Sequence, residues 1–129
     1  MKIVKDVMVA EVVRISPFAS IRAALSAMKK HRLKSLVVDK RHEHDAYGLI
    51  TYTNIIKTII AEDGDIDLLN VYDVCAKPAI TVGKSLGVRH VAALMSDHRV
   101  KRVLVVDDNE LIGIITMEDI IDELMQGID

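Results

Sequence analysis

Apolar residues recur along the chain in two patterns, one typical of helices and one typical of buried strands. From residue 21 they follow the i, i+3, i+4, i+7 spacing that places side chains on one face of a helix. The same spacing begins again at residue 88. The two predicted helical stripes consist of Ile21, Ala24, Leu25 and Met28, and of Val88, Val91, Ala92 and Met95.

Two runs rich in Val and Ile follow each predicted helix, as expected for buried strands. The runs are SLVVDK (35–40) and YGLIT (47–51), then RVLVVDD (102–108) and LIGIIT (111–116). Each half also starts with a short helical turn, at about 3–8 and 70–75, and a brief strand, at about 12–15 and 79–82. The last helices carry Ile55, Ile56, Ile59 and Ile60, and Ile120, Ile121, Leu124 and Met125.

The two halves are copies of one another. At an offset of 67 residues, Val4 matches Val71 and MKKHR (28–32) matches MSDHR (95–99). A first-half loop that is three residues longer, KRHEHDAY (40–47) against DNELI (108–112), accounts for most of the later change in offset. We infer a tandem duplication, and the predicted division is repeat 1 at 1–62, a linker at 63–69 and repeat 2 at 70–129.

Each repeat therefore has the order β-α-β-β-α after its short turn. Such a unit is too small to cover its own sheet, so two units need one another to bury a core. The predicted fold class is α/β of the α+β type, with two tandem βαββα repeats packed about a pseudo-twofold axis.

Composition narrows the class of protein. The chain has 129 residues, a formal net charge of −2, 50% hydrophobic residues and 3% aromatic residues. We expect an aliphatic core, with apolar surface left over for a second subunit. The small net charge produces no overall electrostatic field that would attract nucleic acid or a membrane. A single cysteine, Cys75, excludes an internal disulfide and suits a reducing compartment. Apolar runs near the start are too short for a signal peptide or a membrane span, so a cytoplasmic location is predicted.

A nine-residue segment occurs in two similar copies, GLITYTNII (48–56) and GIITMEDII (113–121). Thr51 and Thr116 each end a strand and open a helix, with Asn54 and Asp119 three residues later. This spacing fits a capping box, in which the two side chains satisfy free backbone N–H groups at the helix start. It also fits a nucleotide site, because a helix N-terminus attracts phosphate and a carboxylate accepts the hydroxyls of a ribose. The two roles are compatible, since a cap can be shared with a ligand.

The doubled βαββα unit, the G-h-h-h-T-x-x-D pattern (h, apolar) in GIITMED and the stretch HRVKRVLVVD resemble a tandem pair of CBS domains, or Bateman module. CBS domains take their name from cystathionine β-synthase. The resemblance covers both repeats, which leaves no room in this sequence for a fused enzyme. It implies a module that binds AMP, ADP, ATP, S-adenosylmethionine or NAD, often forms face-to-face dimers and regulates another protein.

Carried onto this sequence, the resemblance assigns the better cleft to the second motif. Asp119 would bind the ribose diol, Thr116 would bind phosphate or ribose oxygens, and Lys101 and Arg102 would face the phosphate. From the first half, residues flanking the adenine would be Ser16, Pro17, Ile21, Leu33 and Lys34. Glu118 stands near the phosphate position, and its charge favours an AMP-like or phosphate-free ligand over ATP.

The first-motif cleft departs from the family pattern at Asn54, which stands where the diol-binding Asp is expected. An amide offers one carbonyl acceptor and no charge, so this cleft is ranked second. Its predicted residues are Val82, Gly83, Val100, Lys101, Thr51, Thr53 and Asn54.

The other chemically reactive or charged residues have simple structural explanations. The basic runs KKHRLK (29–34) and HRVKR (98–102) are interpreted as solvated helix ends rather than a nucleic-acid surface. His42 and His44 are assigned to a polar surface loop rather than a metal site. Cys75 is expected to act as a small hydrophobe, and no enzyme signature or catalytic cofactor is predicted.

The predicted function is thus a free-standing regulatory module that binds an adenosine-type ligand, forms a homodimer and signals to a regulated protein whose identity the sequence leaves open. The alternative is a ligand-free scaffold for dimerisation or interaction, whose clefts have decayed.

Overall fold

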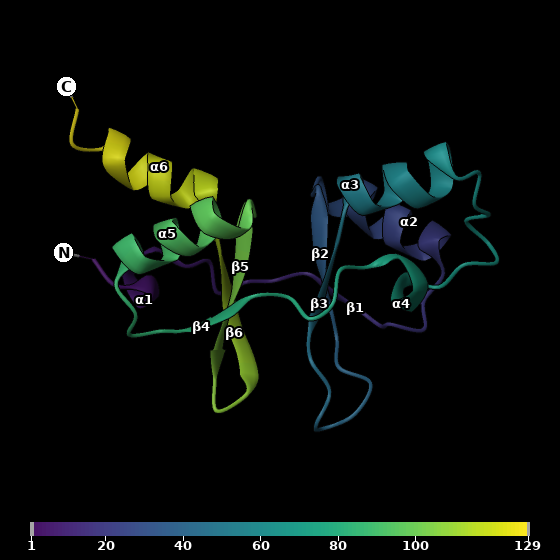
Figure 1. Cartoon of the computed structure of the whole chain (residues 1–129), viewed down its shortest axis with the longest axis horizontal. Helices are drawn as coiled ribbons and strands as arrows, with labels where there is room; N and C mark the ends of the chain where they lie inside the picture. The colour runs from purple at the N-terminus through teal and green to yellow at the C-terminus, as the bar shows by residue number, and fades with distance from the viewer. Residues whose placement is uncertain (1, 129) are drawn as a thin grey trace. The chain divides into compact units, whose positions relative to one another are not determined.

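The computed structural model describes residues 2–128, which form two compact units. Unit 2 is Val13–Ala79, and unit 1 combines the described residues up to Val12 with those from Ile80 onward. The elements of unit 2 are β1 (Arg14–Ile15), α2 (Ile21–His31), β2 (Ser35–Val38), β3 (Gly48–Thr51), α3 (Tyr52–Ile55), the π-helix η1 (Ile56–Ala61) and α4 (Val71–Val74). Those of unit 1 are α1 (Val4–Val7), β4 (Thr81–Gly83), α5 (Val88–His98), β5 (Arg102–Asp107), β6 (Glu110–Thr116) and α6 (Met117–Met125) (Figure 1).

Both units contain the same three-stranded sheet. In unit 2, β1 is parallel to β2, and β2 is antiparallel to β3. In unit 1, β4, β5 and β6 repeat that order and those directions. The predicted order of elements and the mixed fold class are confirmed, whereas the packing of the repeats about a pseudo-twofold axis stays a prediction.

The two long helices bury the predicted apolar stripe, with one correction. Ile21, Ala24 and Met28 are at most 1% exposed in α2, and Val91 and Met95 are buried in α5. Ala92, expected on the α5 stripe, is exposed. At about 100° per residue, position 92 lies farthest from the centre of the stripe at Val91. In its place Leu94, on the other flank, packs against the core.

The short helices exchange between the sequence repeats. α1 belongs to repeat 1 but packs in unit 1, and α4 begins repeat 2 but packs in unit 2. In unit 2 the N–H groups of Val71 and Tyr72 donate to the carbonyls of Ala19 (2.8 Å) and Pro17 (2.9 Å). The matching bonds of unit 1 are Val4 N to Leu86 O (2.8 Å) and Lys5 N to Lys84 O (2.9 Å). The compact units and the sequence repeats therefore divide the chain at different places.

The residues that follow each short helix pair with the last strand of its unit. Val9 and Ile114 exchange two backbone hydrogen bonds of 2.8 and 2.9 Å, and Ala76 and Leu49 do the same. This pairing explains the glycine of each repeated motif. A Cβ on Gly113 would lie 2.9 Å from the Val9 carbonyl oxygen, and one on Gly48 would lie 3.1 Å from that of Ala76. Glycine at both positions therefore permits this close approach of the neighbouring backbone.

Each unit has a core of its own, which differs from the predicted core that two units bury together, whereas the aliphatic character expected from composition is confirmed. The core of unit 2 includes Leu36, Val38 and Ile50, and that of unit 1 includes Val103, Val105 and Ile115. The last helices contribute only part of their apolar residues. Ile55, Ile59 and Ile120 pack against the cores. Of the apolar residues predicted on these helices, the exposed ones are Ile56, Ile60, Ile121, Leu124 and Met125.

Candidate functional site

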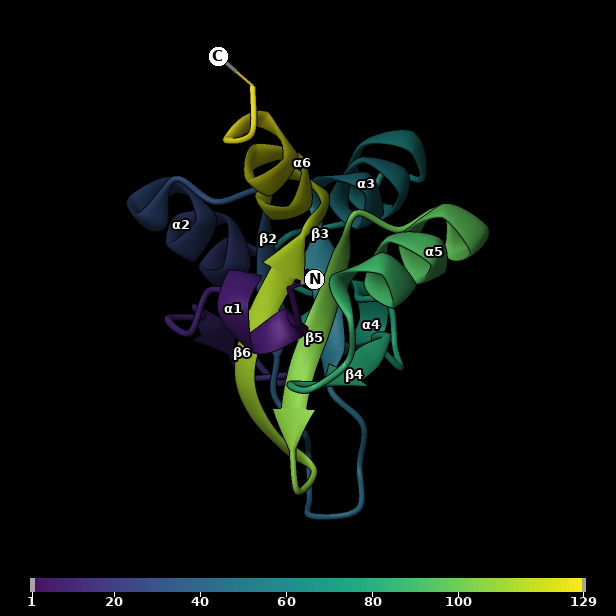
Figure 2. The ribbon, with the colours of Figure 1, turned by 90° about the vertical axis from the view of Figure 1, so that its left-hand side faces the viewer.

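The second repeated motif forms a capping box where β6 passes into α6 (Figures 1 and 2). The Asp119 N–H donates to Thr116 Oγ1 over 3.1 Å. Both the Thr116 N–H and its hydroxyl donate to Asp119 Oδ2, each over 2.8 Å. Oδ2 thus stabilises this strand-to-helix junction, called the Thr116–Asp119 corner below. The other carboxylate oxygen, Oδ1, accepts no hydrogen bond from the described residues. The half-buried Asp119 can therefore cap the helix and still offer an acceptor to a ligand.

The first motif builds the same corner with an amide. Thr51 N–H and hydroxyl donate to Asn54 Oδ1 over 2.9 and 3.0 Å, and the Asn54 N–H donates to Thr51 Oγ1 over 3.3 Å. Because the carbonyl oxygen is used by the cap, the remaining group of Asn54 is its NH₂ donor. The two corners therefore present opposite chemistry, an acceptor at Asp119 and a donor at Asn54. The capping interpretation is confirmed in both repeats.

Basic residues adjoin each corner from the central strand. Arg102 pairs with Thr116 across the β5–β6 ladder, and the Met117 N–H donates to the Lys101 carbonyl over 2.8 Å. Lys101 is exposed and Arg102 half-buried, and neither forms an ion pair within residues 2–128. Unit 1 thus brings together four predicted ligand residues: Lys101, Arg102, Thr116 and Asp119. Glu118, in the first turn of α6, is exposed.

Unit 2 repeats this arrangement with fewer charges. Ser35 pairs with Thr51, and the Tyr52 N–H donates to the Lys34 carbonyl over 3.2 Å. Thr53 and Lys34 are exposed, and Leu33 is half-buried. The first-motif residues Thr51, Thr53 and Asn54 therefore share a corner with Lys34.

The residues predicted to flank the adenine, Ser16, Pro17 and Ile21, have structural roles within unit 2. Ser16 Oγ accepts from Phe18 N over 3.1 Å, and the Pro17 carbonyl accepts from Tyr72 N over 2.9 Å. Ile21 is 0% exposed and belongs to the core of unit 2. Since these residues lie in unit 2, their approach to Thr116 and Asp119 stays a prediction.

The remaining residues of the first-motif prediction lie in unit 1. Val82 is 7% exposed in β4, Gly83 ends that strand with its surface exposed, and Val100 is half-buried before β5. Their contribution to the first-motif cleft also stays a prediction.

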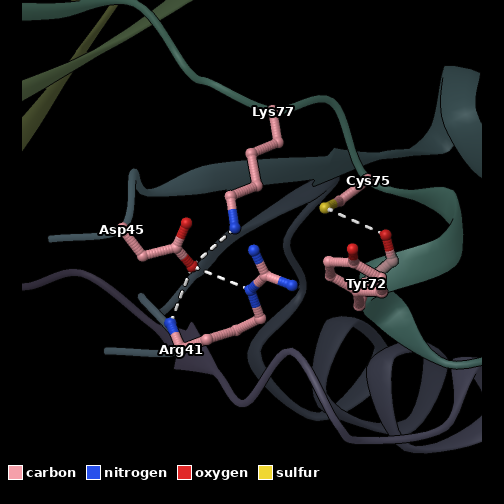
Figure 3. A network of polar contacts seen from close by, with 5 residues as sticks. All are labelled: Arg41, Asp45, Tyr72, Cys75 and Lys77. Carbon is pink, nitrogen blue, oxygen red and sulfur yellow. Dashed lines mark hydrogen bonds and ion pairs between the residues drawn. The ribbon is translucent and has the colours of Figure 1, made fainter. Parts of the chain in front are cut away.

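Sequence reasoning missed a polar network around Asp45 (Figure 3). Asp45 Oδ2 accepts from Lys77 Nζ over 2.6 Å, from the Arg41 N–H over 2.9 Å and from Arg41 Nε over 3.1 Å. The carboxylate side chain is 8% exposed, and the Lys77 bond is the main cause that holds its pKa well below the usual carboxyl range. Arg41 also stacks on Tyr72, 4.7 Å from the ring centroid. The network fastens the longer first-repeat loop to the segment after α4.

The remaining candidate residues, Cys75, His42 and His44, lie in unit 2. Cys75 is half-buried against the core of unit 2, and burial raises the pKa of its thiol, which disfavours a reactive thiolate. His42 and His44 are exposed in their loop. Within residues 2–128, no group of three or more His, Cys, Asp and Glu is placed to hold a metal ion. The helices of that same range are all too short or too polar to cross a bilayer.

A family model for the CBS domain matches residues 4–61 and again residues 71–126. The chain belongs to the CBS domain family. The uncharacterized protein MK0525 of Methanopyrus kandleri is 32% identical over 95 residues, or 73% of this chain and 48% of that protein. The inosine-5'-monophosphate dehydrogenase of Methanocaldococcus jannaschii is 33% identical over 118 residues, 90% of this chain and 22% of the enzyme. The chain thus spans about half the length of MK0525 and less of the dehydrogenase.

Solved structures of CBS proteins share the fold. A hexameric CBS-CP12 protein from bloom-forming cyanobacteria has a TM-score of 0.86 and 36% identity, and covers 94% of this chain and 70% of its own. The CBS domain pair of protein MJ0100, in complex with 5-methylthioadenosine and S-adenosyl-L-methionine, has a TM-score of 0.82 and 29% identity. That similarity covers 95% of this chain and 99% of the MJ0100 chain.

Proposed function

We propose that the chain is a regulatory CBS module that binds an adenosine-containing ligand and signals its presence to a partner protein. The observation that carries the proposal is the Thr116–Asp119 corner, where Oδ2 caps α6 and Oδ1 is left to accept from a ligand. A carboxylate in such a position suits the hydroxyls of a ribose. The ligands of the MJ0100 pair, both adenosine derivatives, support the same ligand class.

An AMP-like or phosphate-free ligand is favoured over ADP, ATP or NAD. Lys101 and Arg102 adjoin the corner and can hold one phosphate, with the guanidinium gripping two of its oxygens. The exposed Glu118, one residue before Asp119, would repel further phosphate charge. S-adenosylmethionine remains an alternative of the same adenosine class.

Signalling requires that the ligand prefer one arrangement of the protein over another. A homodimer provides such arrangements, and the last helices offer apolar surface for one. Leu124 and Met125 are 68% and 58% exposed in unit 1, and Ile56 and Ile60 are 59% and 71% exposed in unit 2. Sedimentation at tens of micromolar should show a dimer, whereas a clean monomer there would refute it. We assign the module no catalytic step and a cytoplasmic location.

The test is titration calorimetry of AMP, ADP, ATP, NAD, S-adenosylmethionine and 5-methylthioadenosine into the protein and into Asp119→Asn. Asn is the chosen substitution because Asn54 forms the same capping box in the first repeat, so the helix start is kept. Loss of a charge-assisted hydrogen bond should weaken binding by about 10- to 150-fold. Equal affinity of both proteins would refute the role of Asp119.

The donor at Asn54 predicts that the first corner holds a ribose poorly. Asn54→Asp should add the missing acceptor and raise the number of adenosine ligands bound per chain. If the unmodified protein binds none of the six compounds while folded and dimeric, the alternative of a ligand-free interaction scaffold replaces this proposal.

A further inference from the structure

The C-terminal turn of α2 and the residues leading into β2 carry a concentration of positive charge. This surface, called the basic end below, consists of Lys29, Lys30, His31, Arg32 and Lys34, all of them exposed. None of these five side chains forms an ion pair with any residue in the range 2–128. By contrast, cations elsewhere in the described range pair with carboxylates, among them Lys2, Arg14, Arg22, Arg41, Lys77 and Lys84.

The charge is unevenly divided between the units. Unit 2 has 10 Lys and Arg against 8 Asp and Glu, while unit 1 has 7 against 11. The positive excess of unit 2 thus coincides with the basic end. Because charges act over about 8 Å at physiological salt, a partner at the basic end responds to this local excess rather than to the net charge of the chain.

The two repeats show that the helix does not need these cations. Lys29 and Lys30 correspond to Ser96 and Asp97 in α5, which has the same length of 11 residues. Both helices are followed by a C-cap arginine with a left-handed backbone conformation, Arg32 at φ 55° and Arg99 at φ 54°. The dipole of each helix favours cations at its C-terminus. Helix α5 nevertheless carries the carboxylate of Asp97 in its last turn. The two lysines are therefore an addition particular to the first repeat.

The position of Lys30 directs this charge outward. Met28, two residues earlier, is 1% exposed in the core of unit 2. At about 100° per residue, Lys30 lies on the opposite side of the helix from the core. An anion held there would lie outside unit 2. Toward its other edge the basic end reaches Tyr52, which is 46% exposed and whose N–H bonds the Lys34 carbonyl.

We propose that the basic end binds an acidic segment of the protein that this module regulates, an inference that rests on the proposed function. Clusters of cations recognise acidic peptide motifs through charge-assisted hydrogen bonds. The end of one helix is about 10 Å across, which suits a short acidic segment. Sequence-independent binding of a nucleic acid depends on neutralising many phosphates with Lys and Arg, whereas the basic end offers only four such side chains.

The test measures fluorescence anisotropy of a labelled oligoglutamate peptide with the whole chain, at rising salt. The informative variant is Lys29→Ser with Lys30→Asp, which copies the residues of α5. A milder variant, Lys29→Gln with Lys30→Gln, keeps helix-favouring side chains. Each exposed ion pair changes affinity by about 1.5- to 5-fold, so the first variant should bind the peptide about tenfold more weakly and the second variant less so.

Absent peptide binding, or equal binding by the protein and both variants, would overturn the proposal. A single-stranded oligonucleotide and inorganic tripolyphosphate are titrated alongside. If either binds more tightly than the peptide and loses that affinity in the variants, the acidic-protein assignment is wrong. Adenosine-ligand titration of the same samples is a separate readout. Its failure, with peptide binding intact, refutes the proposed ligand and not the basic end.

Discussion

Replacement of Gly113 by alanine tests how the exchanged N-terminal segment is held in unit 1. The added Cβ would lie 2.9 Å from Met8 Sδ and 2.9 Å from the Val9 carbonyl oxygen. Met8 can rotate away, but the Val9 carbonyl accepts from Ile114 N over 2.9 Å and cannot retreat without stretching that bond. Relief of the contact therefore requires movement of the segment that carries α1, whose Val4 is fully buried in the core of unit 1.

The expected loss of stability follows from three contributions. Overpacking of a tight contact costs about 1–3 kcal/mol. Weakening of the two Val9–Ile114 hydrogen bonds adds about 0.5–1.5 kcal/mol each at most. The lower entropy of an unfolded alanine chain offsets about 0.4–1 kcal/mol. We expect a net loss of about 2 kcal/mol or more in the free energy of unfolding. At about 2.1 cal/mol/K per residue over 129 residues, this lowers Tm by about 7 °C.

Urea and thermal denaturation measure the loss, and two other glycines calibrate it. A Cβ on Gly48 would meet Ala76 O at 3.1 Å and Cys75 Sγ at 3.2 Å, so Gly48→Ala should cost less. A Cβ on Gly83 would meet nothing within 4 Å, so Gly83→Ala should be neutral or slightly stabilising. Hydrogen exchange at the Val9 amide should also accelerate in Gly113→Ala. Equal stability of the Gly113 and Gly83 variants would refute this account of the motif glycines.

Three further changes have expected outcomes of known direction. Thr116→Val removes the hydroxyl that caps α6 and should cost about 0.5–2 kcal/mol in urea denaturation, whereas Thr53→Val, on an exposed side chain, should change little. Leu36→Ala, at a site 1% exposed, should cost about 2–5 kcal/mol, while Leu68→Ala, 79% exposed, should stay within about 0.5 kcal/mol in the same assay. Asp45 has a pKa lowered from 3.8, so its contribution is fully present above that pH and is lost on further acidification. Asp45→Asn should therefore be less stable at neutral pH and show a shallower loss below pH 3.8, as measured by denaturation across pH.

Each of these comparisons has a result that would count against it. Equal stability of the two threonine variants would mean that the cap contributes nothing. A large loss in Leu68→Ala would show that its exposure is misjudged. An Asp45→Asn variant with an unchanged acid limb would mean that the Lys77 and Arg41 contacts do not form in solution.

The sequence predicts the helices and strands well because the spacing of apolar residues that identifies them involves only near neighbours in the chain. The stripe at Ile21, Ala24 and Met28 and the doubled corner at Thr51 and Thr116 depend only on neighbours a few positions away.

The exchange of the short helices could not be read from the sequence. The segments VKDV (4–7) and VYDV (71–74) carry nearly the same pattern, so either could dock on either unit by local criteria. The choice is made by tertiary contacts between residues far apart in the chain. Asp45 was missed because a carboxylate in a polar loop has no periodic signal, and its partner Lys77 lies 32 residues away.

The most direct test of the central claim compares an adenosine ligand with its 2′,3′-dideoxy analogue by calorimetry, in the protein and in Asp119→Asn. If Asp119 accepts the ribose hydroxyls, the unmodified protein should prefer the ribose ligand by about 10- to 150-fold, and the variant should lose most of that preference. If both proteins discriminate to the same extent, or neither discriminates, Asp119 does not bind the ribose and the site is wrong.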